Sequence, residues 1–323
     1  MRIECHGFVD LQVNGFGGID FNAPGLSADA IRAALAALRA TGVTRVLPTL
    51  ITGPLDQFRA CARALAETVD PAVAGLHMEG PYISPEDGAR GAHPREWTRP
   101  ASVDDFARRQ EAARGRIVLV TLAPEVPGAM DLIEQLVRDG VRVAVGHTEA
   151  SPGAIRDAIS AGASLATHLG NGCAAVLPRH PNVIWEQLAS DALHMSLIVD
   201  GHHLPAATVK AMIRAKTPDR TILVSDAIAA AGCGPGAYHI GGVAVDVSDT
   251  GRASLAGTPY LAGSTLTMPE AVSLTVGFTG LPLECVLRMA TSQPAAYLGI
   301  PTAGTVVADW DEAHRRLRVV DVR

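Results

Sequence analysis

Three residues of types that bind divalent metals end separate apolar segments of this 323-residue chain. Glu79 closes one such segment just before a Gly-Pro break, and His147 and His168 directly follow two later segments. A carboxylate at the end of a buried strand is unfavourable unless a partner compensates its charge. One Glu and two His at strand ends form a suitable ligand set for a catalytic divalent metal. We therefore expect Glu79, His147 and His168 to hold a metal ion.

Two further residues are compatible with more than one role. His77 shares a strand face with Glu79, because side chains alternate along a strand, but it lies two residues deeper. We interpret His77 as a supporting or core residue rather than a ligand. Asp226 follows the apolar run 221–225, where an acid near a metal can accept a proton from water and later donate it. An Asp in this position is also typical of a helix or turn cap, and the spacing alone leaves both interpretations open.

Polar residues in two loops are candidates for binding an anion. His202 and His203 follow the turn signal Asp200-Gly201. They are compatible with contacts to an anionic group, with a role as an acid, or with solvated loop positions. Arg179 suits a phosphate or carboxylate, although an Arg in a surface loop is otherwise ordinary.

A regular alternation of strand-like and helix-like segments must position these residues. Eight Val/Ile/Leu-rich runs read as strands buried on both faces: 7–13, 44–50, 73–79, 117–122, 141–146, 164–169, 195–199 and 221–225. Amphipathic helical patterns lie between them at 28–40, 56–68, 102–114, 129–138, 151–161 and 205–215. Ser27 and Ser151 are suitable N-caps, and Gly42, Gly140 and Gly162 end helices just before the next strand. Eight such repeats favour a (β/α)8 TIM barrel over an open sheet.

The barrel prediction concentrates the chemistry at one end. Active sites of such barrels lie at the carboxyl ends of the strands. The polar residues that fall there are Gln12, Asn14, Glu79, His147, His168, His202, His203 and Asp226. We expect the barrel to span 1–303, with a β excursion at 232–263 and helices at 264–276 and 283–292. Residues 304–323 are expected to form a short C-terminal β tail.

Composition excludes several other classes. The net charge is −6 and the sequence pI is about 6.0, so nothing indicates a nucleic-acid or anionic-membrane partner. No apolar run approaches the roughly 20 residues that span a bilayer, and the N-terminus lacks the apolar core of a signal peptide. The five cysteines are scattered without metal-finger or CxxC spacing, which favours reduced thiols and a cytoplasmic protein.

The motifs together resemble a known family. Gly7–Gly15, His77–Tyr82, Gly146–Thr148, Thr167–Asn171, Asp200–His203, Val224–Ala227 and Leu261–Met268 occur in the order found in N-acetylglucosamine-6-phosphate deacetylases of the amidohydrolase superfamily. The resemblance covers nearly the whole chain. It implies a metal-dependent hydrolase that converts N-acetylglucosamine 6-phosphate into glucosamine 6-phosphate and acetate.

The resemblance also implies roles for individual residues. Glu79, His147 and His168 would bind one divalent metal, with Zn²⁺ expected and Fe²⁺, Co²⁺ or Mn²⁺ compatible, and Asp226 would be the catalytic acid and base. Substrate contacts are implied at Ala92, His93, Asn171, Gly172, Arg179, His203, Leu261, Ala262 and Gly263. Arg179 would reach the site of a partner subunit, so a homodimer is implied.

Three departures from the family pattern affect the expected number of metal ions, the expected small domain and the identity of the sugar. Gln12 and Asn14 replace the HxH pair that holds a second metal in many amidohydrolases, and no Lys ends strand 4, so we expect a single metal. The small β-sandwich domain is expected to be reduced or absent, with 304–323 as its remnant. The loop 170–175 lacks the usual aromatic, which leaves the sugar open. Hydrolysis of a different N-acyl or cyclic amide is the alternative, and a non-catalytic sugar-phosphate binder is the third candidate.

Overall fold

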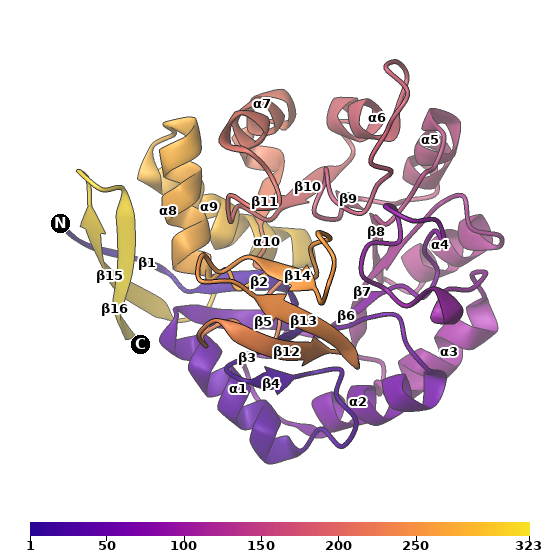
Figure 1. The fold of residues 1–323 in the computed structure, drawn as a ribbon, viewed down its shortest axis with the longest axis horizontal. Helices are drawn as coiled ribbons and strands as arrows, with labels where there is room; N and C mark the ends of the chain where they lie inside the picture. The colour runs from indigo at the N-terminus through magenta and orange to yellow at the C-terminus, as the bar shows by residue number, and fades with distance from the viewer.

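The computed structural model describes residues 1–323, and eight parallel strands form its centre. They are hydrogen-bonded in the order β11-β10-β9-β8-β7-β6-β5-β2, and helices surround them (Figure 1). The strands are β2 (Phe8–Val13), β5 (Val43–Leu50), β6 (Leu76–Glu79), β7 (Ile117–Leu122), β8 (Arg142–Val145), β9 (Leu165–Ala166), β10 (His194–Leu197) and β11 (Thr221–Leu223). This arrangement confirms the predicted (β/α)8 barrel.

The barrel closes between β2 and β11 through a short seam. Val13 forms a parallel bridge with Ala227, and the backbone N–H of Asn14 donates to the Ala227 carbonyl at 2.7 Å. Asp10, fully buried on β2, accepts the Ser225 backbone N–H at 3.2 Å. Burial raises the pKa of Asp10 to about 6. The carboxyl group of Asp10 therefore helps to join the first and last strands.

The outer helices follow the predicted pattern with small shifts at their ends. They are α1 (Ala28–Ala40), α2 (Leu55–Glu67), α3 (Val103–Ala112), α4 (Ala129–Arg138), α5 (Pro152–Ser160), α6 (Val183–Ala189), α7 (Ala206–Lys216), α8 (Met268–Thr279), α9 (Leu283–Ala290) and α10 (Ser292–Leu298), with 3-10 turns at Arg95–Trp97 and Pro218–Arg220. Ser27 and Ser151 cap α1 and α5 by accepting backbone N–H groups, as expected. The short helices α6 and α10 were not predicted. No helix combines the length and apolarity that crossing a bilayer requires.

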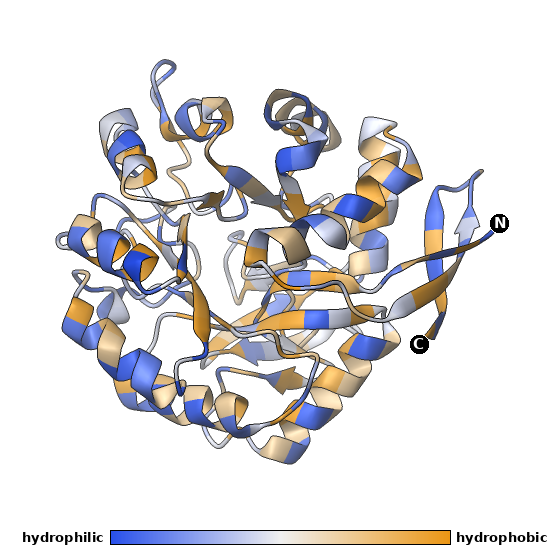
Figure 2. Cartoon of the chain, turned by 180° about the vertical axis from the view of Figure 1, so that it is seen from behind, coloured by the Kyte–Doolittle hydropathy of each residue, from blue (hydrophilic) through white to orange (hydrophobic).

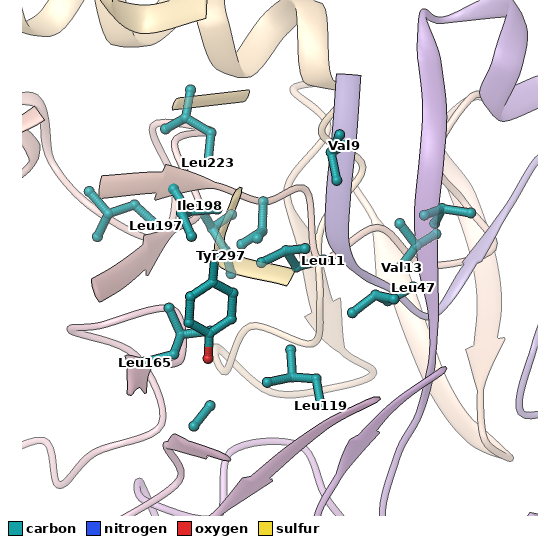
Figure 3. Close-up of a cluster of buried hydrophobic side chains, with 14 of the residues drawn as sticks. Val9, Leu11, Val13, Leu47, Leu119, Leu165, Leu197, Ile198, Leu223 and Tyr297 are labelled. Atoms are coloured by element: carbon teal, nitrogen blue, oxygen red, sulfur yellow. The ribbon is translucent and has the colours of Figure 1, made fainter. Parts of the chain in front are cut away.

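Apolar side chains fill the barrel and the layer between strands and helices. Figure 2 shows hydrophobic colouring along the central strands and hydrophilic patches on the surrounding helices. Inside the barrel, Leu11, Leu119 and Leu165 are buried around Tyr297 of α10 (Figure 3). The Tyr297 hydroxyl lies 3.0 Å from the Ser164 hydroxyl, just before β9 begins. Helix α10 therefore closes the amino end of the barrel, which leaves the carboxyl end available for a site.

A separate three-stranded sheet lies beside the barrel and contains both termini (Figure 1). β15 (Thr305–Asp311) and β16 (Arg316–Val322) form an antiparallel hairpin, and β1 (Arg2–His6) pairs with β15 on the other side. The strand β1 was not predicted, although its burial alternates residue by residue as expected for a half-covered strand. The barrel is therefore accompanied by a small sheet of three strands.

A second three-stranded sheet covers part of the carboxyl end of the barrel. It comprises β12 (Gly236–Ile240), β13 (Val243–Val247) and β14 (Ala253–Leu255), all antiparallel, within the segment expected to form a β excursion. A separate apolar cluster that includes Ile228, Val245 and Ala262 joins this sheet to the segments after β11. A hairpin of β3 (Gly15–Phe16) and β4 (Ile19–Asp20) lies on the neighbouring side. The β12–β14 segment forms one wall of the cavity described next.

Candidate active site

A cavity of about 500 Å³ opens at the carboxyl end of the barrel. Its floor consists of residues at the ends of barrel strands, and its walls come from the loop after β6, the loop after β9 and the β12–β14 segment. Among the residues predicted for the site, the cavity is lined by Glu79, Ala92, His93, His147, His168, Asn171, Gly172, His203, Asp226, Leu261, Ala262 and Gly263. Asn14 also lines it, whereas Arg179 and His202 do not. The fold thus gathers residues as distant in the sequence as Asn14 and Gly263.

Glu79 is the centre of the predicted ligand cluster. Its Oε1 lies 3.1 Å from His147 Nε2 and 3.0 Å from His168 Nε2. The side-chain amide of Gln12 donates to the same oxygen at 2.9 Å. All three predicted ligands are buried, and their ligand atoms lie within 4.8 Å of one another. The structure therefore brings Glu79, His147 and His168 into one compact group.

The surroundings of His147 select the ring nitrogen that faces this group. His147 Nδ1 lies 2.9 Å from the carbonyl oxygen of Ala89, which can only accept a hydrogen bond. The Nδ1–H therefore donates to Ala89, and in the neutral ring the lone pair is on Nε2. Gly172 packs directly against the ring: a Cβ there would lie 2.8 Å from Nδ1, and its backbone φ is +56°. The loop after β9 therefore helps to hold the His147 ring in place.

The donor set fits a divalent cation. A carboxylate oxygen and the Nε2 atom of neutral His147 converge, and two lone pairs at this distance repel unless a proton or a cation lies between them. Burial alone would raise the pKa of Glu79, but hydrogen bonds and charges of His147 and His168 hold that pKa well below its ordinary value. The pKa of His147 is raised because Glu79 outweighs the effect of burial. A carboxylate paired with two imidazoles is the chemistry that an open zinc site uses.

Asp226 lies on the same cavity and is held by Asn14. The Asn14 side-chain amide donates to Asp226 Oδ1 at 2.7 Å. Burial and the negative charge of Glu79 raise the pKa of Asp226 to about 7, although Asn14 and the histidines oppose the shift. A carboxyl group with a pKa near neutrality is suited to accepting and then returning a proton. Of the two roles considered for Asp226, the geometry favours proton transfer over capping.

Three cavity residues occupy strained backbone conformations. His147, His168 and Asp226 have φ values of +51°, +28° and +50° respectively. Non-glycine residues in this region carry a penalty of about 1–3 kcal/mol each, and such strain clusters at functional sites. Each residue lies two or three positions beyond the end of a barrel strand, and each side chain lines the cavity. The strained backbone at these three positions is consistent with a functional site, where the position of a side chain is maintained at a cost in folding stability.

His93 faces Glu79 from the loop after β6. Its Nε2 lies 3.7 Å from Glu79 Oε2, and its Nδ1 lies 2.9 Å from the Thr52 hydroxyl. Burial and the charge of His147 lower the pKa of His93 to about 3, so the ring is neutral at pH 7. In the tautomer that accepts a hydrogen bond from Thr52, the remaining N–H is on Nε2 and points toward the cavity. Thr52, just after β5, was not predicted as a site residue.

His203 is held by Asp200 in the loop after β10. His203 Nδ1 lies 2.7 Å from Asp200 Oδ2, and Asp200 Oδ1 accepts the backbone N–H groups of His202 and His203 at 2.8 Å each. Burial would raise the pKa of Asp200, but the hydrogen bond with His203 lowers it further than burial raises it. The ionised Asp200 therefore fixes the orientation of His203. His202 instead contacts the Thr250 carbonyl, outside the cavity.

His77 lies below the cavity rather than in it. Its Nε2 is 2.8 Å from the Thr121 hydroxyl, which is in turn 2.8 Å from the Thr167 hydroxyl. Burial lowers the pKa of His77 to about 4, so the ring is neutral. The structure therefore places His77 in a polar network beneath Glu79, as its deeper position on the strand predicts.

The fold and this cavity define a class of protein: a (β/α)8 hydrolase barrel with a Glu/His/His cluster that fits a divalent metal and an Asp after the last strand. Residues 5–310 match the amidohydrolase family. The chain is 35% identical to the N-acetylgalactosamine-6-phosphate deacetylase of Shewanella sp. (strain ANA-3), over 97% of this chain and 80% of that protein. It is 34% identical to the N-acetylglucosamine-6-phosphate deacetylase of Bacillus subtilis (strain 168), over 91% of this chain and 75% of that protein.

Solved structures agree with these relatives. The N-acetyl-D-glucosamine-6-phosphate deacetylase of Mycobacterium smegmatis, in a mutant form bound to N-acetyl-D-glucosamine-6-phosphate, matches with a TM-score of 0.91 and 34% identity, over 100% of this chain and 85% of that chain. The deacetylase of Pasteurella multocida matches with a TM-score of 0.89 and 30% identity, over 100% of this chain and 85% of that chain. The chain belongs to the amidohydrolase family and, within it, to the N-acetylhexosamine-6-phosphate deacetylases. The resemblance inferred from the motifs is thereby confirmed.

Proposed function

We propose that this protein hydrolyses the N-acetyl amide of N-acetylglucosamine 6-phosphate to glucosamine 6-phosphate and acetate. The observation that carries the proposal is the position of Asp226, whose pKa is about 7, in the same cavity as Glu79, His147 and His168. Amide hydrolysis needs a group that removes a proton from water and later protonates the leaving nitrogen, and Asp226 is suited to both steps. Membership of a deacetylase family supports the same reaction.

Glu79, His147 and His168 would hold one divalent metal, for which we propose Zn²⁺; Fe²⁺, Co²⁺ and Mn²⁺ also suit this ligand set. Such an ion would polarise the acetyl carbonyl and lower the pKa of a nearby water molecule. Gln12 donates its amide to Glu79 and Asn14 donates to Asp226, so the two residues in place of the HxH pair are engaged as hydrogen-bond donors. This supports a site with one metal.

Asp226 performs the proton transfers in this proposal. As a carboxylate, it accepts a proton from the attacking water while the water oxygen bonds to the acetyl carbon. As an acid, it then gives that proton to the amide nitrogen, and the electron pair of the breaking C–N bond passes to the nitrogen. Asn14 keeps one Asp226 oxygen fixed, which leaves the other for the proton.

His93 assists at the carbonyl oxygen. A neutral ring with its N–H on Nε2 can donate to the negative charge that develops on this oxygen. His203, oriented by Asp200, contacts the phosphate, together with the backbone of Asn171 and Gly172. Ala92 and the segment Leu261–Gly263 line the rest of the sugar site.

Arg179 lies outside the cavity of its own chain, and the resemblance to the deacetylases implies that it reaches the cavity of a second subunit. We therefore propose a homodimer in which Arg179 of a partner subunit contacts the phosphate. We further propose that the enzyme acts in amino-sugar metabolism in the cytoplasm, where its five free cysteines would stay reduced.

The relatives differ in the epimer of the sugar that their names give. They include deacetylases of both N-acetylglucosamine 6-phosphate and N-acetylgalactosamine 6-phosphate, so the second compound is the specific alternative. A panel of both sugar phosphates, unphosphorylated N-acetylglucosamine and a cyclic amide, with acetate release as the readout, tests the proposal. We expect the highest kcat/KM for N-acetylglucosamine 6-phosphate. Turnover of only the cyclic amide, or binding without turnover, would contradict it.

A further inference from the structure

Two arginines of this chain, Arg90 and Arg252, line the cavity. Only one of them pairs its positive charge with a carboxylate. Arg90 Nη2 donates to Asp87 Oδ1 at 2.5 Å, and its Nη1 donates to the His93 carbonyl at 2.6 Å. Its charge is therefore paired with a carboxylate. Arg252 donates to the Ser254 hydroxyl and to the Pro259 carbonyl, and it forms no ion pair. A guanidinium has five N–H donors, so further donors of Arg252 remain for a ligand.

The backbone around Arg252 is braced on two sides. The Gly251 carbonyl accepts the Thr265 hydroxyl at 2.8 Å, and Gly251 itself has a φ of +78°. The Thr250 carbonyl lies 3.0 Å from His202 Nε2. His202 precedes His203, whose ring lines the cavity, so the turn that carries Arg252 is tied to the loop that carries His203. The guanidinium is thus held in place before any ligand binds, which reduces the entropy lost on binding.

The charge distribution of the cavity indicates what Arg252 would contact. The buried floor contains the carboxylates Glu79 and Asp226, whereas Arg252 is half-buried in the β13–β14 wall. A substrate whose amide reaches the floor and whose opposite end is anionic would place that anion near the unpaired cation. A planar guanidinium with free N–H groups matches the oxygens of a phosphate.

We propose that Arg252 is a specificity-determining residue that binds the 6-phosphate of the substrate from within the same chain. This inference rests on the proposed function. Arg252 and His203 together would supply a phosphate site that is complete in one subunit, and Arg179 of a partner subunit would add to it. Arg252 thereby distinguishes the phosphorylated amino sugar from the neutral one.

The test compares Arg252→Gln and Arg252→Lys with the wild type. KM and kcat are measured for N-acetylglucosamine 6-phosphate and for N-acetylglucosamine. We expect Arg252→Gln to raise KM for the phosphorylated sugar by roughly tenfold or more, with kcat changed little, because a charge-assisted hydrogen bond is lost. The preference for the phosphorylated sugar should fall by the same factor, and Arg252→Lys should retain part of it. Arg156→Gln, an exposed change on α5 at a residue paired with Glu186, is the matched control and should keep the full preference.

Arg252 also donates a hydrogen bond to the Pro259 carbonyl. A purely structural role for Arg252 must therefore be distinguished from phosphate binding. Such a role would impair both sugars equally and leave the preference unchanged, which would overturn the inference. Calorimetric titration with inorganic phosphate gives a readout that needs no turnover: weaker binding by Arg252→Gln supports the inference, and equal binding overturns it. If the wild type releases no acetate from either sugar, the proposed function fails, and the phosphate titration still decides the role of Arg252.

Discussion

The Asn14 side chain donates a hydrogen bond to Asp226 across the seam of the barrel, with Nδ2 2.7 Å from Oδ1. Asn14 follows β2, and Asp226 lies beyond the end of β11. Because β2 and β11 are the first and last strands of the barrel, this contact helps to close it. It favours the ionised form of Asp226 and opposes the raised pKa that burial and Glu79 produce. The residue that replaces a metal-binding His in the sequence pattern thus has a defined contact with the proposed acid and base.

Replacing Asn14 should change how activity depends on pH. Asp226 must be ionised to accept a proton, so activity falls as pH decreases through its pKa. Asn14→Ala removes a hydrogen bond to the ionised form, so the pKa should rise and the acid limb of the kcat profile should move to higher pH. A pH–rate profile of the metal-loaded enzyme checks this. An acid limb that stays in place would show that Asn14 does not tune Asp226.

The protein should bind one metal ion per chain and should lose activity when a chelator removes that ion. The amide nitrogens of Gln12 and Asn14 donate hydrogen bonds to Glu79 and Asp226 and do not serve as metal ligands. We expect one equivalent of metal per chain by elemental analysis and loss of acetate release after chelation. Restored metal at about 1,000 times its Kd should stabilise the fold by about 4 kcal/mol. Two equivalents per chain would contradict the single-metal account.

Gly172 should be needed for metal binding because of its position against His147. In Gly172→Ala, the new Cβ would lie 2.8 Å from His147 Nδ1, and the ring must shift. Disturbing a residue that orients a ligand should weaken metal binding by roughly tenfold or more. The matched control is Gly257→Ala, which has a similar positive φ of +72° but no atom within 4 Å of the new Cβ. Both variants should lose about 1 kcal/mol of stability from the backbone conformation.

A competition titration of metal between each variant and a chromophoric chelator separates these effects. Weakened metal binding only in Gly172→Ala is expected. Equal metal affinity in the two variants would mean that the contact with His147 has no influence on the site.

A partly buried ion pair near the loop after β6 should make stability depend on pH. Asp105 accepts hydrogen bonds from Arg109 at 2.8 Å and Tyr82 at 2.7 Å, and Arg109 is fully buried. Burial would raise the pKa of Asp105, but the contacts with Arg109 lower it below its ordinary value. Its folded pKa is depressed, so its stabilisation is present above about pH 4 and is lost as pH falls through the folded pKa.

Asp105→Asn should lower the free energy of unfolding at pH 7 by about 3 kcal/mol, because Arg109 is left without its partner. The difference from the wild type should narrow as pH decreases below about 4. Urea denaturation of both metal-free proteins over a pH series measures this difference in the free energy of unfolding. A difference that is constant with pH would exclude a charge-dependent contribution from Asp105.

The sequence predicted those parts of the structure that depend on local pattern. A buried strand that ends in a polar residue is visible as an apolar run followed by Glu79 or His147, and barrel topology then requires these ends to meet. The depth of His77 also followed from the two-residue period of a strand. The strand β1 was overlooked although its alternation was present, and α6 is only one or two turns long, between a proline-rich loop and β10.

Contacts between distant loops could not be predicted. Nothing near Thr52 indicates that it meets His93, and nothing near Ala89 indicates that its carbonyl orients His147. These contacts depend on how loops from different strands fold over the barrel end. For the same reason, no pattern near Arg252 indicates that it lines the cavity.

Acetate release by Asp226→Asn tests the central claim most directly. The variant keeps the shape of the side chain and its distance from Asn14, but it cannot accept a proton as a carboxylate does. Metal content and acetate release from N-acetylglucosamine 6-phosphate are measured on the same preparation. The account predicts one metal per chain, as in the wild type, and a fall in kcat of roughly 100-fold or more. Full metal content together with wild-type kcat would contradict it.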